Sequence, residues 1–246
     1  MTSMLPPYKD YGNGKGRKPT QGAGGVPKGT TVATDTLIHI MLDKSGSMES
    51  VRQATIDGFN RFRHDQLEVG GDALVSLTLF DSTVAEVCSA VPLRELTDLD
   101  RTNYRPDGMT ALYDAIGSAV ARTDALIATK VVRPQRVLFA IITDGQENAS
   151  RIHQRAAIFD TVRAHEEAGW SFVFLGANID SYAASQSVGV AGAARTRDWI
   201  ATPEEMEKNM RVFSHATSRY RDESAASAVM MDRAFFIDED EKAGEE

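Results

Sequence analysis

The chain has 246 residues, of which 42% are hydrophobic and 25% are charged, and its formal net charge at pH 7 is −8. This length suits one domain with tails, since single domains commonly reach about 200 residues or more. The acidic balance argues against general affinity for nucleic acid, and no apolar run approaches the roughly 20 residues that a membrane-spanning helix needs.

The two ends of the chain differ in composition from its middle. Residues 1–33 are rich in glycine, proline and basic residues and show no strand or helix periodicity, which predicts a flexible arm. Residues 223–246 are expected to form a C-terminal extension with an acidic tail. The opening residues lack the apolar centre of a secretory signal, and the single cysteine, Cys88, has no internal disulfide partner. Both features favour a reducing, cytoplasmic setting.

Strand and helix patterns alternate through the predicted domain, residues 34–222. The apolar run LIHIML (37–42) predicts a buried strand, and apolar residues at near-helical spacing from Val51 to Phe62 predict the first helix. A second strand, LVSLTLF (74–80), is separated by only two residues from the segment TVAEVCSAV (83–91). This connection is too short for a parallel crossover, so the two strands should form an antiparallel hairpin.

The second half of the domain continues the alternation. A helical pattern from Leu112 to Leu126 precedes the strand RVLFAIIT (136–143), and a pattern from Ile152 to Val162 precedes the strand FVFLGA (172–177). Thr202 followed by Pro203 marks the start of a last helix. The chain is therefore predicted to be an α/β protein with a doubly wound, mostly parallel sheet, one antiparallel edge strand and helices on both faces.

Oxygen-bearing side chains gather where ligands bind in such sheets, just beyond the carboxyl ends of the strands. Asp43, Ser45 and Ser47 follow the first strand in DKSGSM, and Asp144 follows the strand 136–143 in TDGQEN. Thr110 stands in the polar loop DGMTALYD, at the start of the middle helix. All five are hard oxygen ligands of the kind that Mg²⁺ prefers.

The Asp-x-Ser-x-Ser sequence, the distant Thr in a glycine-containing loop and the distant Asp in TDG together resemble the metal-ion-dependent adhesion site of von Willebrand factor A domains. The resemblance covers roughly residues 36–222 and is strongest to the small stand-alone members in bacteria and their phages. It implies a Rossmann-like, six-stranded sheet in the order 3-2-1-4-5-6. It also implies that Ser45 and Ser47 bind Mg²⁺ or Mn²⁺ directly, Thr110 directly or through water, and Asp43 and Asp144 largely through water.

The same resemblance implies how such a site would work. Few carboxylates among neutral hydroxyls leave the ion electrophilic, so an Asp or Glu of a partner protein fills an open position. Met109 and Tyr113 flank Thr110 and are expected to form an apolar rim, while Lys44 is expected to be a solvated rim residue. The expected function is metal-dependent protein binding, with an AAA+ ATPase or an assembly neighbour as the partner.

Three other interpretations remain open at this stage. DKSGS alone is also typical of a turn with helix-capping serines. The fold could instead serve as a packing module in an assembly, for example in a phage particle. An enzyme is disfavoured, because Ser45 replaces the second carboxylate of an Asp-x-Asp nucleophile and the usual hydrolase and phosphate-binding motifs are absent.

His39, inside a predicted strand, is expected to be a core residue.

Overall fold

The computed structural model of the protein describes residues 32–177, 181–190, 195–222 and 235–236. Residues 1–31 of the predicted arm and most of the predicted C-terminal extension lie outside these residues, while the last two residues of the predicted arm belong to the first strand. Within them, none of the helices combines the length and the hydrophobicity needed to cross a bilayer.

A six-stranded sheet in the order β3-β2-β1-β4-β5-β6 forms the centre of the molecule. Its strands are β1 (Val32–Asp43), β2 (Ala73–Phe80), β3 (Val84–Pro92), β4 (Val132–Thr143), β5 (Ser171–Ala177) and β6 (Thr196–Trp199). Neighbouring strands run parallel, except that β3 pairs antiparallel with β2 at the edge. The predicted fold class, strand order and hairpin are therefore confirmed.

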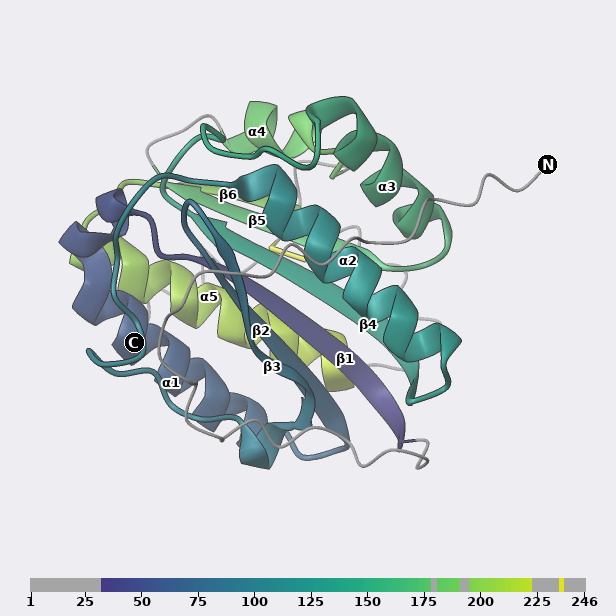
Figure 1. Ribbon diagram of the computed structural model, residues 1–246. Coiled ribbons are helices and arrows are strands. Elements are labelled where there is room, and N and C mark those ends of the chain that lie inside the picture. The colour runs from purple at the N-terminus through teal and green to yellow at the C-terminus, as the bar shows by residue number, and fades with distance from the viewer. Residues whose placement is uncertain (1–31, 178–180, 191–194, 223–234, 237–246) are drawn as a thin grey trace, which may run out of the picture.

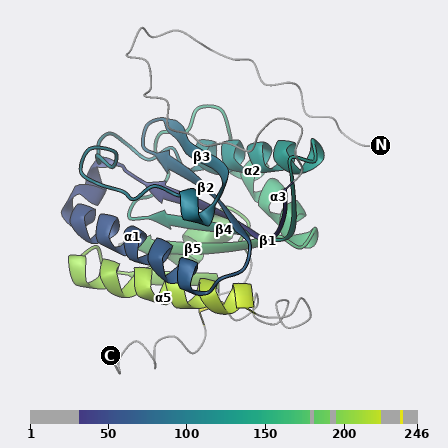
Figure 2. The same ribbon diagram turned by 90° about the horizontal axis from the view of Figure 1, so that it is seen from below.

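Helices cover both faces of this sheet (Figures 1 and 2). They are α1 (Arg52–Glu68), α2 (Leu112–Ala128), α3 (Arg155–Glu167), α4 (Ser181–Ser187) and α5 (Pro203–Asp222), with short 3-10 turns η1 (Gly46–Val51) and η2 (Leu93–Glu95). Figure 2 shows α1 and α5 side by side on one face and α2 and α3 on the other.

The central strands are apolar on both faces because each face is covered. In β4, Leu138, Ala140 and Ile142 belong to the core beneath α1 and α5. The alternate residues Phe139 and Ile141 belong to the core beneath α2 and α3. This double burial explains why the strand sequences read as continuous apolar runs without polar alternation.

The last helix begins where the sequence predicts. Pro203 is its first residue, and the Thr202 hydroxyl accepts a bond from the Glu205 N–H at 3.3 Å, as a helix-capping side chain does. The third helix differs from the prediction, because it starts at Arg155 and leaves Ile152 in the preceding loop with 68% of its surface exposed.

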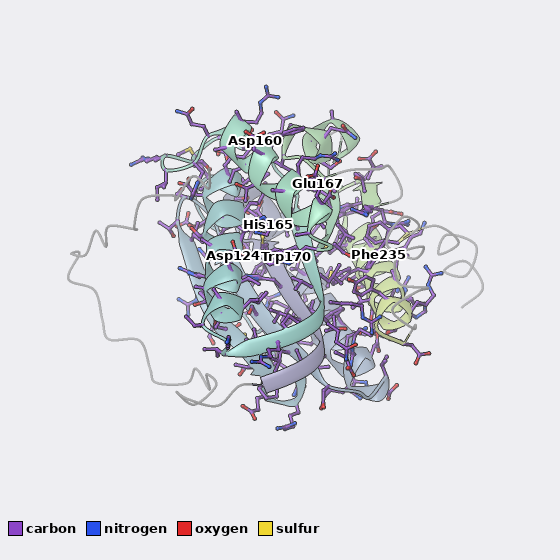
Figure 3. All side chains as sticks on the ribbon, turned by 90° about the vertical axis from the view of Figure 1, so that its right-hand side faces the viewer. Asp124, Asp160, His165, Glu167, Trp170 and Phe235 are labelled. Carbon is purple, nitrogen blue, oxygen red and sulfur yellow. The ribbon has the colours of Figure 1, made fainter. Side chains whose placement is uncertain are left out.

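Phe235 extends the core beyond α5. Its ring centroid lies 6.5 Å from that of Phe213 and 6.0 Å from that of Tyr220, and only 2% of the residue is exposed. The Arg219 side chain donates a bond to the Phe235 carbonyl at 3.3 Å. Figure 3 shows Phe235 beside α5, so the packed domain includes part of the predicted C-terminal extension, residues 223–246.

A surface pair joins α2 to α3 (Figure 3). His165 Nε2 lies 3.1 Å from an Asp124 carboxylate oxygen, and its Nδ1 lies 2.7 Å from the Thr161 carbonyl oxygen. Both ring nitrogens thus face acceptors, an arrangement that favours the imidazolium ion, and the bond to Asp124 raises the pKa of His165.

His39 lies in the core, as the sequence predicts. Its ring is 1% exposed and is stacked on Phe139 at a centroid distance of 4.8 Å. Its two nitrogens lie 2.8 Å from the Thr78 hydroxyl and 3.2 Å from the Thr123 hydroxyl. Burial, with a smaller contribution from the Arg122 charge, lowers the pKa of His39 to about 3.

This buried histidine should make stability depend on pH. As the pH falls below the ordinary pKa of 6.5, His39 becomes protonated in the unfolded chain but stays neutral in the folded protein. The contribution of His39 to the unfolding free energy is therefore fully present above pH 6.5 and decreases as the pH falls towards the folded pKa of about 3. Between about pH 7 and about pH 5, wild type should lose about 2 kcal/mol of unfolding free energy more than His39→Gln. Urea unfolding measures both proteins, and equal losses would contradict the assignment.

Candidate metal centre

The pairing of β1 with β4 brings both aspartates of the predicted site to one edge of the sheet. Leu42 pairs with Ile142, so the ends of the two strands, Asp43 and Thr143, come level. Asp144 is the next residue along the chain after β4. The two carboxylates therefore meet at the carboxyl edge without any long loop between strand and site.

Asp43 is fully buried and held from several directions. One carboxylate oxygen accepts the Ser45 N–H at 2.6 Å, and the other accepts the Thr143 hydroxyl at 2.6 Å. The Tyr104 hydroxyl donates to the Asp43 backbone carbonyl at 2.7 Å. These bonds fix both the backbone and the side chain at the end of β1.

The two serine hydroxyls connect Asp43 to Asp144. Ser45 Oγ lies 3.2 Å from Ser47 Oγ, and the Ser47 hydroxyl donates to Asp144 Oδ1 at 2.6 Å. Ser45 and Asp144 are buried, whereas Ser47 is exposed. The cluster is thus open to solvent at Ser47.

Thr110 completes the cluster from the loop before α2. It is 2% exposed, and a Cβ built on Gly145 would lie 3.0 Å from its hydroxyl oxygen and 3.8 Å from Ser47 Oγ. The structure therefore brings together all five residues that the sequence singled out: Asp43, Ser45, Ser47, Thr110 and Asp144.

The charges of the cluster favour a cation. Burial raises the pKa of Asp43 to about 6, against the hydrogen bonds from Thr143 and Ser45, and the nearby Asp144 charge adds to the rise. Burial also raises the pKa of Asp144. A divalent ion would offset this cost of holding two carboxylates out of water.

The donor set fits a hard ion. The described part of the chain contains no group of three or more His, Cys, Asp or Glu side chains placed to hold a metal. An ion at this edge must therefore rely on the three hydroxyls beside the two carboxylates. An all-oxygen set of this kind suits Mg²⁺ or Mn²⁺ better than ions that favour nitrogen or sulfur ligands.

The residues around the cluster differ in part from expectation. Lys44 is not solvated, because its ammonium group is paired with Asp81 and only 19% of its side chain is exposed. Met109 is 49% exposed. Tyr113 is half-buried and packs against the core beneath α2 and α3.

Sequence reasoning missed the residues that support the ligands. Their contribution depends on hydrogen bonds between segments that are distant in sequence, and no local motif predicts such bonds. The acidic residue in the first turn of α2 was the one available signal, since acids are frequent there. These supporting residues are Tyr104, Asp114, Thr143, Glu147, Asn148 and Ser150.

Two glycines of the site offer a matched test of its packing. A methyl group at Gly145 would press on the Thr110 hydroxyl at 3.0 Å, whereas the nearest atom to one at Gly46 is the Gly108 carbonyl oxygen at 3.4 Å. Gly145→Ala should therefore lose about 1 kcal/mol of unfolding free energy in urea, the low end of the usual cost of overpacking. Gly46→Ala should lose less, and the opposite ranking would contradict the geometry.

Comparison with known proteins rests on structure alone. No protein-family model and no curated protein matches the sequence. Proximal thread matrix protein 1 from the mussel byssus superposes with a TM-score of 0.55 and 12% identity, over 74% of this chain and 48% of its own. This chain thus spans about half the length of that protein.

Two further solved structures carry the same architecture. A von Willebrand factor type A protein from Catenulispora acidiphila has a TM-score of 0.51 and 14% identity, over 75% of this chain and 43% of its own. Manganese-loaded TRAP protein from Plasmodium vivax has a TM-score of 0.52 and 16% identity, over 71% of each chain. At these identities the likeness establishes the fold, and the chain has a von Willebrand factor A-like fold.

Proposed function

We propose that this chain is a metal-ion-dependent protein-binding module that captures an acidic side chain of a partner. The observation that carries the proposal is the meeting of five oxygen-bearing side chains at the carboxyl edge of the sheet, with an opening at Ser47. Mg²⁺ or Mn²⁺ would be held by Asp43, Ser45, Ser47, Thr110 and Asp144.

The bound ion would supply a Lewis-acidic position for a carboxylate oxygen. The chain's own residues prepare that position. The Ser45 N–H and the Thr143 hydroxyl hold Asp43, and the short bond from Ser47 holds Asp144. With only two carboxylates in the set, the charge of a third, from a partner, remains favourable.

Exposed apolar surface beside the site supports a protein ligand. Met109, next to Thr110, is 49% exposed and would add contact area that a single ionic bond lacks. We therefore assign the module to binding and not to catalysis, in the cytoplasm or a phage particle, as in the small stand-alone bacterial and phage type. Its partner would be an AAA+ ATPase or an assembly neighbour that presents an Asp or Glu.

The comparisons support two versions of this proposal. The manganese-loaded state of the Plasmodium vivax protein favours a divalent ion in this fold. The likeness to a thread matrix protein favours the second candidate, a structural protein that uses the fold as a packing module in an assembly.

Metal binding should raise stability. Mg²⁺ would be held by five side chains that converge only in the folded state, so at about 100 times its dissociation constant it should add about 2.7 kcal/mol to the unfolding free energy. Titration calorimetry and melting curves with Mg²⁺, Mn²⁺ and a chelator measure this. Asp43→Ala should abolish the increase.

A second variant guards against misfolding of the first, because Asp43 is fully buried. Ser47→Ala removes an exposed hydroxyl and should keep the fold while weakening Mg²⁺ binding. The weaker divalent-ion sites of proteins have dissociation constants on the order of millimolar. A wild-type protein that binds no Mg²⁺ at millimolar concentration would therefore contradict the metal-dependent proposal.

Partner capture should depend on one carboxylate. A pull-down in Mg²⁺ and in chelator identifies partners, and crosslinking locates the contacting Asp or Glu. Changing that residue to Asn or Gln keeps its shape and removes its charge, and should weaken binding by about 2 kcal/mol or more. Retained affinity in Mg²⁺, or a large interface indifferent to chelator, would instead favour the structural candidate.

A further inference from the structure

The loop after β4 and the start of α2 exchange hydrogen bonds through a carboxylate on each side. From the loop, Glu147 accepts the Tyr113 N–H of α2 at 2.9 Å with one oxygen. Its other oxygen accepts the N–H groups of Ala149 and Ser150 at 2.9 and 2.7 Å. Glu147 therefore organises its own loop and caps α2 at the same time.

Asp114 makes the reciprocal set from the first turn of α2. Its carboxylate accepts the N–H groups of Arg151 at 2.8 Å, Ile152 at 3.0 Å and His153 at 2.8 Å. Its own N–H donates to the Ser150 hydroxyl at 3.0 Å. These bonds explain why α3 starts later than its apolar pattern predicts, since the residues before Arg155 are turned towards α2.

Thr110 is held within this exchange. Its N–H donates to the Asn148 side-chain oxygen at 2.8 Å. Its carbonyl accepts the N–H groups of Asn148 and Ala149 at 3.0 and 3.2 Å. The backbone of Thr110 is thus bonded on both sides to the loop that begins with Asp144.

Helix chemistry explains why carboxylates serve here. The first N–H groups of a helix have no partner within it and attract negative charge. Ala111, which precedes α2, has no side chain able to cap them. Glu147 and Ser150 supply the caps from a segment more than thirty residues away, with sequence separations of 34 and 36.

We infer that Glu147 and Asp114 are positioning residues that lock Thr110 to the loop carrying Asp144, so that these two ligands form one rigid unit. This inference rests on the proposed function, because it concerns the same metal centre. It deepens that proposal by dividing the centre into two parts. Adjustment on binding an ion or a partner falls on the exposed Ser47, while Thr110 and Asp144 keep their relative position.

The test uses two measurements on Glu147→Gln, which keeps the shape of the side chain and turns an amide NH₂ towards backbone donors. Hydrogen exchange in metal-free protein should accelerate by about tenfold or more at the Thr110 and Tyr113 amides and stay unchanged at Ile40 in β1. Titration with Mg²⁺ alone should show an affinity about 10- to 100-fold weaker than in wild type.

Two control variants separate positioning from other effects. Glu49→Gln removes the same charge from a side chain that is 59% exposed in η1, and should leave Mg²⁺ affinity unchanged. Gly58→Ala would place a methyl group 2.6 Å from Met210 Cγ and so disturb the packing of α1 against α5. This variant should lower the unfolding free energy but leave the Mg²⁺ affinity unchanged. If Glu147→Gln folds poorly, Asn148→Ala removes the acceptor of the Thr110 N–H from an exposed position and should show a smaller loss of the same kind.

Each outcome bears on one conclusion. Normal exchange at Thr110 in a folded Glu147→Gln protein overturns the rigid unit, whether or not the wild type binds metal. Mg²⁺ affinity within twofold of wild type, about 0.4 kcal/mol, overturns the positioning role. Protected amides in a wild-type protein that binds no Mg²⁺ overturn the proposed function, and with it the assignment of Glu147 and Asp114 to a metal centre.

Discussion

The parallel pairing of β1 with β4 is the constraint on which the site depends. It sets Asp43 level with Thr143, and the Thr143 hydroxyl then bonds to the Asp43 carboxylate across the two strands. A slip by one residue would exchange the two faces of the strand and send Leu138 and Phe139 to the wrong cores. The hydrophobic register that holds the sheet together therefore also aligns the polar cluster at its edge.

Within the polar cluster, neutral hydrogen-bond donors stabilise the two buried carboxylates. Hydroxyls and backbone N–H groups surround Asp43 and Asp144, so neither carboxylate is buried without partners. The nearby Lys44 ammonium is paired with Asp81, and it also interacts with the charge of Asp43. A small cation would further offset the charge of the two carboxylates, so charge and geometry support the same functional proposal.

Local chemistry made much of this structure predictable. The long apolar strands, the two-residue hairpin connection and the Thr202–Pro203 helix start are all encoded within short windows, and so are the five oxygen-bearing side chains. The resemblance implied a sixth strand, but the sequence pattern did not locate it, because the four residues of β6, TRDW, carry no apolar run. The start of α3 was placed too early because bonds from Asp114, distant in sequence, override the helical pattern at Ile152. The spacing of apolar residues along the sequence does not predict tertiary contacts of this kind.

The burial of Phe235 bears on where the domain ends. A protein cut after α5, at Asp222, would keep every strand and helix described here and would still be incomplete, because the rings of Phe213 and Tyr220 would lose the aromatic side chain packed on them. Such a fragment would present a new aromatic patch to solvent, and patches of that sort promote self-association. The functional unit for expression, crystallisation or fusion to another protein therefore extends at least to Phe236, which packs edge-on against Phe235.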